Sequence, residues 1–181
     1  LNSPPNLGVY DAEKPEQFAT NPFQAAWETP LSYMSREEDY TNNRFLSNVF
    51  AEVKLFKDLK LRSNLGADVS NGVYEFYVDP IRTVYGRQNH GVSNLSKQEY
   101  LSWLSENTLT YSKYFGRNSL TALVGMSVQD YSFGHAYINT KDLPLQYVKT
   151  TNAGNQIEGA GNTKTHSALV SQFGRIIYDF D

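Results

Sequence analysis

The stretch "VKLFKDLKLRSNLGADVS", residues 53–70, carries the strongest structural signal in the chain. From residue 59 to residue 69, every second side chain is apolar or small: Leu59, Leu61, Ser63, Leu65, Ala67 and Val69. The positions between them are charged, polar or glycine: Lys60, Arg62, Asn64, Gly66, Asp68 and Ser70. Strict alternation is typical of a β-strand with one dry face and one wet face. The dry face then contacts either the core of a soluble protein or lipid.

Composition limits the classes of protein that the chain can be. Its 181 residues carry a formal net charge of −3 and no cysteine. A weakly acidic chain without a basic patch does not suit a nucleic-acid partner, and it has no disulfide framework or thiolate metal site. Aromatic residues make up 14% of the chain, which together with many Asn, Ser, Thr and Gly residues favours an all-β fold. No apolar run is long enough for a transmembrane helix, but a transmembrane β-barrel needs only half-apolar strands.

The alternation recurs along the chain and predicts five long antiparallel strands. We expect them at about residues 43–56, 59–77, 100–114, 118–137 and 164–181. Residues 1–40 show no sustained period and are expected to form a loop segment, with one short helical turn at "NPFQAAWE", 21–28. The chain does not begin with Met, and it ends within an alternating pattern. We therefore expect both ends to be cuts in a longer protein.

The lengths of the predicted connections alternate between short and long. Tight turns follow the first and third strands, near 57–58 and 115–118, whereas long polar loops, 79–99 and 138–163, follow the second and fourth. All short turns therefore lie at one end of the sheet, which is typical of outer-membrane barrels with short periplasmic turns and long extracellular loops. The strands also exceed the 3 to 10 residues usual in soluble proteins. A soluble sandwich remains compatible with the alternation itself.

No motif for catalysis, metal binding or cofactor binding stands out. The three histidines, His90, His135 and His166, lie far apart without metal-ligand spacing. There is no nucleophile elbow, and "GNQIEGAGN", 154–162, lacks the Lys-Ser/Thr pair of a phosphate-binding loop. We therefore expect no enzyme, no metal and no cofactor.

Aromatic and hydrogen-bonding side chains of the predicted loops are the candidate ligand contacts. Sugars and peptides stack on aromatic faces while amide and guanidinium groups bind their polar atoms. The candidates are Trp27, Tyr85, Arg87, Asn89, Tyr137 and Tyr147. The alternative is that these side chains anchor their own loops.

Three segments together resemble one family. The run "NPFQAAWETPLSYMSREEDYTNNRFLSNVFAEVKLFKDLKLRSNLGADVSN", 21–71, is similar to the barrel portion of SusC/RagA-type TonB-dependent outer-membrane transporters. The stretches "SENTLTYSKYFGRNSLTALVGMSVQ", 105–129, and "SQFGRIIYDFD", 171–181, are similar to later strands of the same barrel. Each motif is loose, but their order and spacing over most of the chain are specific in combination.

The resemblance implies a fold, a function and partners. Such transporters form barrels of about 22 strands around a plug. They lie in the bacterial outer membrane, import oligosaccharides or peptides with energy from TonB, and work with a SusD-like surface lipoprotein. Five strands cannot close such a barrel, so the resemblance implies a transmembrane β-barrel fragment that contacts the lipid bilayer. TonB would act through a plug that this chain lacks.

Two other functions remain open from the sequence. The first is a soluble or secreted all-β binding module, for example one for carbohydrate, which would fold cooperatively without detergent. The second is a passive porin-like channel without a plug.

Overall fold

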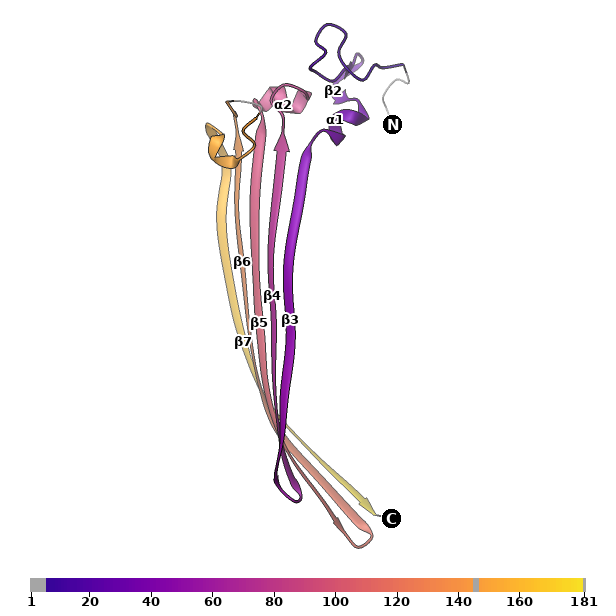
Figure 1. The fold of residues 1–181 in the computed structure, drawn as a ribbon, viewed down its shortest axis with the longest axis vertical. Coiled ribbons are helices and arrows are strands. Elements are labelled where there is room, and N and C mark those ends of the chain that lie inside the picture. Colours follow the sequence, from indigo (N-terminus) through magenta and orange to yellow (C-terminus); the bar gives the residue numbers. More distant parts are fainter. Residues whose placement is uncertain (1–5, 145–146, 181) are drawn as a thin grey trace. The chain divides into compact units, whose positions relative to one another are not determined.

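The computed structural model describes residues 6–144 and 147–180, with the backbone alone for 25–27 (Figure 1). A small hairpin comes first, formed by β1 (Thr20–Asn21) and β2 (Gln24–Glu28), and is followed by α1 (Pro30–Met34). The long strands are β3 (Glu37–Phe56), β4 (Leu59–Val78), β5 (Val92–Phe115), β6 (Asn118–Lys141) and β7 (Gln156–Phe180). Between them lie α2 (Val84–Asn89) and a 3-10 helix (Thr151–Ala153).

The five long strands form one antiparallel sheet in the order β3-β4-β5-β6-β7, so each strand pairs with its neighbours in sequence. The sheet is open: within the described residues, β3 and β7 each have one hydrogen-bonded neighbour. The prediction of an all-β fold with about five long antiparallel strands is confirmed.

The strands begin earlier, or end later, than predicted at their loop ends. Strand β3 starts at Glu37 rather than at residue 43, β5 at Val92 rather than at 100, and β7 at Gln156 rather than at 164. These extensions are mostly polar, and their few apolar residues, such as Val92, Leu95 and Ile157, do not recur at every second position. They therefore carry no apolar period, although backbone pairing needs none. The connection after β4 also contains α2, where a continuous loop was expected.

The helical turn predicted at 21–28 is wrong. Residues Gln24–Glu28 form β2, which pairs with β1 in an antiparallel hairpin. The helix follows at Pro30–Met34, with proline at its first turn. Proline presets the backbone for a helix start and lacks the N–H that would be unsatisfied there.

The chain divides into two compact units. The loop-bearing unit comprises Leu1–Asn42, Gly72–Gln98 and His135–Thr163, and the turn-bearing unit comprises Asn43–Asn71, Glu99–Gly134 and Lys164–Asp181. Both long connections, 79–91 and 142–155, belong to the first unit, and both two-residue turns, 57–58 and 116–117, belong to the second. The predicted separation of short turns from long loops is therefore confirmed.

In the turn-bearing unit, side-chain contacts define a polar face of the sheet. Arg44 makes a double hydrogen bond to the carboxylate of Asp68, with N–O distances of 2.9 and 2.7 Å. On the same face, Lys60 lies 3.3 Å from Glu52. All four residues are even-numbered and lie on β3 and β4, as the alternation predicts.

The opposite side of this unit is its apolar face, formed by odd-numbered positions of β3, β4 and β5 and even-numbered positions of β6 and β7. Two shallow hollows on this face bring together side chains from four strands: Leu59 and Leu61, Leu109, Val124, and Ile176. The apolar face also includes Val49, Val53, Leu65, Met126 and Val170. The facing of β4 predicted from its alternation thus extends across the sheet.

Nothing within the described residues covers the apolar face. Leu65, Val124 and Ile176 are 52%, 59% and 76% exposed. The buried hydrophobic residues of the described chain all lie in the loop-bearing unit: Phe18, Ala19, Tyr77, Val78, Val92 and Leu143. A soluble antiparallel sheet packs one face on a core. The turn-bearing unit has no such core of its own.

No helix within the described part of the chain is long and apolar enough to cross a membrane.

Gly86 tests the packing of the connection between β4 and β5. It is buried in α2, and its N–H donates a 2.8 Å hydrogen bond to the Thr83 hydroxyl. A Cβ at this position would overlap the carbonyl oxygen of Asp79, which is backbone and cannot move alone. We predict that Gly86→Ala displaces residues 79–91 and speeds proteolytic cleavage there.

The matched control is Gly159→Ala in the same unit, where the nearest atom to an added Cβ is 3.7 Å away. Limited proteolysis of the protein, read by mass spectrometry, distinguishes the two variants. Equal cleavage of both would show that the connection does not pack as described.

Candidate functional site

A polar hollow of about 620 Å³ lies in the loop-bearing unit. It is lined by the first residues of β3, the last residues of β4, the first residues of β5 and the connection between β6 and β7. The lining residues are Arg36, Glu37, Glu38, Asp39, Glu75, Phe76, Tyr77, Ser93, Asn94, Leu95, Lys149, Thr150 and Thr151. We call this site the polar hollow.

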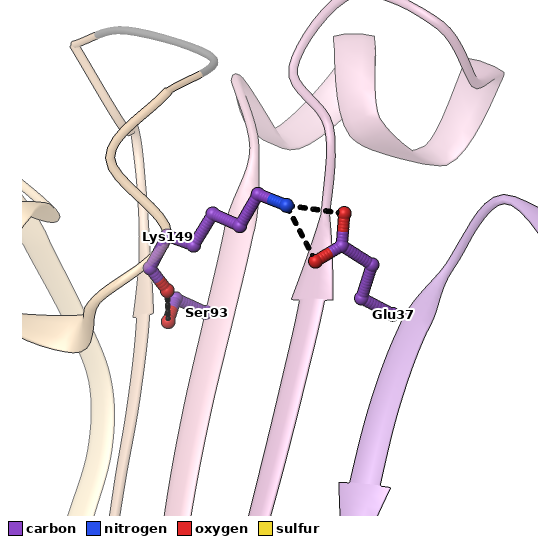
Figure 2. A network of polar contacts seen from close by, with 3 residues as sticks. All are labelled: Glu37, Ser93 and Lys149. Atoms are coloured by element: carbon purple, nitrogen blue, oxygen red, sulfur yellow. Dashed lines mark hydrogen bonds and ion pairs between the residues drawn. The ribbon is translucent and has the colours of Figure 1, made fainter.

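Lys149 lines the polar hollow and reaches from the β6–β7 connection to Glu37, as Figure 2 shows. Its ammonium contacts both carboxylate oxygens of Glu37, at 2.5 and 2.6 Å. The same ammonium lies 5.4 Å from the centre of the Tyr77 ring, within the range of a cation–π contact. The backbone of Lys149 is also fixed, because its carbonyl accepts a 2.7 Å hydrogen bond from the Ser93 hydroxyl. The β6–β7 connection is therefore tied to β3 and β5 through one residue.

Two hydrogen bonds support this arrangement, one between β6 and β5 and one between β5 and the connection that carries Lys149. Ser93 is 2% exposed and Thr140 is 1% exposed. The Thr140 hydroxyl donates a 3.0 Å hydrogen bond to the Ser93 carbonyl, while the Ser93 hydroxyl serves Lys149. Buried hydroxyls with full partners hold a fixed orientation. Lys149 is thus positioned on a rigid support.

Carboxylates dominate the rest of the lining. Four of them come from two strands: Glu37, Glu38, Asp39 and Glu75. Glu38 accepts a 3.0 Å hydrogen bond from the Tyr74 hydroxyl. The Arg36 guanidinium lies 4.5 Å from the Tyr33 ring centre and 5.5 Å from that of Tyr85. The hollow therefore offers charges of both signs beside aromatic surface.

Two buried polar atoms at the hollow have no hydrogen-bond partner within the described residues: Nε of Arg36 and Oδ1 of Asn94. Buried polar groups are nearly always paired with protein, water or a ligand. Both atoms belong to residues that line the hollow. Its chemistry suits non-covalent recognition of a polar molecule.

Burial also raises the pKa of two tyrosines of the loop-bearing unit, Tyr77 and Tyr74. Burial, followed by the Asp79 and Glu37 carboxylates, raises the pKa of Tyr77 to about 12. Burial, followed by the hydrogen bond to Glu38, raises the pKa of Tyr74. Both phenols stay neutral at physiological pH, and that of Tyr74 donates its hydrogen bond to Glu38.

A further pKa shift occurs in the N-terminal segment. The backbone N–H groups of Glu13 and Lys14 donate hydrogen bonds to Asp11, at 2.9 and 3.1 Å. These bonds stabilise the carboxylate and lower the pKa of Asp11. The contacts lie within one turn and indicate a local structural role.

Three of the predicted ligand residues lie together on α2. Tyr85 is 41% exposed and contacts Arg36 at the edge of the polar hollow. The Arg87 guanidinium donates to the carbonyl oxygens of Ile81 and Arg82, and the Asn89 side chain donates to that of Tyr85. Arg87 and Asn89 therefore hold the connection between β4 and β5, and of the three only Tyr85 touches the hollow's lining.

The other three predicted residues lie elsewhere. Tyr137 is on β6 and stacks on His135, with ring centres 5.7 Å apart. Tyr147 lies in the β6–β7 connection and is 78% exposed. Trp27 is in β2, and its side chain lies outside the described residues. Within the described part, no hydrogen bond or ring contact joins Tyr137 or Tyr147 to α2, so a ligand role for the set stays a prediction.

Sequence reasoning did not find the polar hollow. The acidic cluster "SREEDY", 35–40, is evident in the sequence, but Lys149, which pairs with Glu37 of this cluster, lies 112 residues after it. A pairing across that separation depends on the sheet order, which brings the connection between β6 and β7 over β5. The only available signal was a cluster of charge at a strand start.

The three histidines each have a neighbour within the described residues. His90 lies 3.4 Å from Asp142, His135 is 2.9 Å from the Ser96 hydroxyl, and His166 is 2.8 Å from Asp130. No group of three or more potential metal ligands forms among the described residues. The histidines therefore lie apart, as expected from their spacing.

Comparisons with known proteins identify relatives of transport function. The chain is 25% identical over 183 residues to the TonB-dependent receptor P3 of Formosa agariphila, which covers 97% of the chain and 18% of the receptor. No protein-family model matches the chain. This similarity bears out the resemblance to TonB-dependent receptors inferred from the sequence.

Solved structures show the same fold. The RagAB peptide importer in its open-open state matches with a TM-score of 0.74 and 21% identity, over 84% of this chain and 17% of that chain. Its closed-closed state matches with a TM-score of 0.73 and 19% identity, over 82% and 17%. The chain therefore spans less than a fifth of these relatives. They are a receptor and an importer, which agrees with the prediction that this chain is not an enzyme.

The Lys149–Glu37 pair generates a prediction about the β6–β7 connection. Both side chains are about half exposed, so the pair contributes at most about 1 kcal/mol. We expect Lys149→Met to raise amide hydrogen exchange several-fold at Leu143 and Asn155, whose N–H groups hold this connection to His90 and Asp142.

The control for this prediction is the charge-swapped pair Glu37→Lys with Lys149→Glu, which keeps an ion pair. Exchange in the swapped variant should return towards that of the unaltered protein. If Lys149→Met leaves exchange unchanged, the pair does not tie the connection to β3.

Proposed function

We propose that this chain forms part of the wall and the extracellular connections of an outer-membrane, TonB-dependent nutrient transporter. The observation that supports this proposal most directly is the uncovered apolar face of the turn-bearing unit. A sheet with one polar and one apolar side, and no packed layer on the apolar side, suits a barrel wall between a wet lumen and lipid. The similarity to a TonB-dependent receptor and the fold shared with an importer support the same function.

The length of the apolar band supports the membrane assignment. On the apolar face, the Tyr178 hydroxyl donates to Asn118 at one end of the turn-bearing unit, and His166 pairs with Asp130 at the other. The segment 119–129 between these polar contacts has about 11 residues, and a transmembrane β-strand needs about 9 to 11. The apolar band is therefore long enough to span a bilayer and no longer.

The polar face of the same unit suits a water-filled lumen. Ion pairs such as Arg44–Asp68 and Lys60–Glu52 lie along it. Charged pairs of this kind are costly in hydrocarbon but tolerated beside water. We therefore assign the even-numbered residues of β3 and β4 to the lumen side.

The ligand and the partners are proposed by analogy with the similar proteins. We propose import of a peptide or an oligosaccharide together with a SusD-like lipoprotein, with TonB acting through a plug contributed by sequence outside this chain. The RagAB structures are of a peptide importer, which favours a peptide. The polar hollow, with charges of both signs beside Tyr77, has the chemistry to bind a peptide backbone or its termini. Trp27, Tyr85, Tyr137 and Tyr147 remain candidate contacts.

A passive channel is distinguished from this proposal by its energy source. Uptake through a TonB-dependent transporter stops when TonB is removed, whereas diffusion through a porin-like channel continues. Growth on the imported nutrient, compared between strains with and without TonB, tests this part of the proposal. Growth that is independent of TonB would contradict it.

The facing assignment generates a mutational prediction in β4. Leu65 lies on the apolar face and Asn64, its neighbour, lies on the polar face. Arginine at a mid-bilayer, lipid-facing position costs roughly 2–4 kcal/mol, whereas arginine in a wet lumen costs little. We predict that Leu65→Arg sharply lowers the folded fraction of the full-length protein in the outer membrane, while Asn64→Arg does not.

Heat-modifiable gel mobility of membrane fractions measures this folded fraction. The two variants add the same side chain at adjacent positions, so they differ only in the face that receives it. Equal loss in both variants would contradict the facing assignment. Arg62→Ala, which removes a charge near Phe50 on the polar face, is expected to have little effect.

A further inference from the structure

A second hollow lies where the apolar face of the turn-bearing unit becomes polar. It has a volume of about 420 Å³. Its apolar floor is formed by Val69 and Leu101, and its rim carries Glu99, Lys164 and His166. We call it the interfacial hollow. Side chains of β4, β5, β6 and β7 all contribute to it.

The charged side chains of this hollow differ in whether they have an ion-pair partner. His166 lies 2.8 Å from the Asp130 carboxylate. Within the described residues, Lys164 has no ion-pair partner, which leaves its ammonium available to a ligand. Gly134 lies between Glu99 and Lys164, and side-chain atoms of both come about 4.0 Å from the position of an added Cβ. The absence of a side chain at residue 134 keeps the hollow open between these two groups.

The same face continues from the interfacial hollow into two apolar hollows. Their volumes are about 600 and 560 Å³, and both are lined by Leu109, Val124 and Gly174. Gln172 lines the nearer of the two apolar hollows. It lies six residues after His166 on β7, which is a distance of about 20 Å along the strand. For strands tilted by about 45°, this corresponds to roughly 14 Å of depth, close to half of the hydrocarbon thickness.

We propose that the interfacial hollow binds the phosphate of a membrane lipid, with Lys164 contacting the phosphate and an acyl chain lying along the apolar face between this hollow and the nearer apolar hollow. This inference rests on the proposed function, because it places the apolar face in lipid. The arrangement matches the two ends of one molecule: a cation at the membrane boundary, and an apolar face that runs from it for about the depth of one leaflet.

The test uses the full-length protein that carries this chain, purified in detergent and studied by native mass spectrometry. The probes are phosphatidylglycerol and diacylglycerol with the same acyl chains. We expect the unaltered protein to retain phosphatidylglycerol in preference to diacylglycerol. Lys164→Ala should lower phosphatidylglycerol retention by about tenfold, the effect of one lost charge-assisted hydrogen bond, and leave diacylglycerol unchanged.

Two further variants separate this site from general effects of charge. Lys60→Ala removes a lysine from the polar face and should leave retention unchanged. Gly134→Leu keeps every charge but fills the hollow, and should lower phosphatidylglycerol retention as well. Equal retention of the two lipids by the unaltered protein, or unchanged retention in Lys164→Ala, would overturn the inference.

Failure of this inference can be told apart from failure of the proposed function. Heat-modifiable mobility reports membrane folding independently of lipid retention. A protein that folds in the membrane but shows no dependence on Lys164 has the proposed function without this lipid site. A protein that never enters the membrane lacks the proposed function itself.

Discussion

The structure depends on backbone hydrogen bonding between long neighbouring strands. Hydrocarbon offers no partner for a backbone N–H or C=O group, so a strand that crosses lipid must pair along its whole length on both sides. In β4, β5 and β6 both sides are paired within this sheet, whereas β3 and β7 each leave one side open. The side chains are then free to meet different solvents, and the alternation in β4 records which solvent each face meets. The open edges of β3 and β7 are where further strands of a closed barrel would pair.

The two units share the same strands but differ in burial and in the length of their connections. The turn-bearing unit has almost no buried residues, and its connections are two residues long. The loop-bearing unit contains the buried hydrophobic residues of the described chain, the long connections and the polar hollow. Its buried Ser93 and Thr140 and its Lys149–Glu37 pair fix irregular backbone that no strand neighbour could fix.

Much of the fold could be predicted from the sequence, because a sheet with one apolar and one polar face imposes a period of two. Leu59 to Val69 displays that period without interruption, and the tight turns at 57–58 and 116–117 follow from it. The strand extensions at Val92 and Gln156 could not be predicted in the same way, since their few apolar residues do not recur at every second position. The strand Gln24–Glu28 contains good helix formers, and pairing with Thr20–Asn21 overrides that preference. The polar hollow was missed because it joins residues 112 positions apart.

The most direct test of the account is a cysteine scan of β4. The chain contains no cysteine, so each substitution from residue 59 to residue 70 introduces one thiol into it, which can carry a spin label. In the full-length protein in bilayers, labels at 61, 65 and 69 should be relaxed by oxygen dissolved in lipid, and labels at 62, 66 and 70 by a water-soluble nickel complex. A period of two with these phases would establish that the apolar face meets lipid. Uniform access of the nickel complex along the segment would contradict it and would indicate that β4 belongs to a soluble sheet.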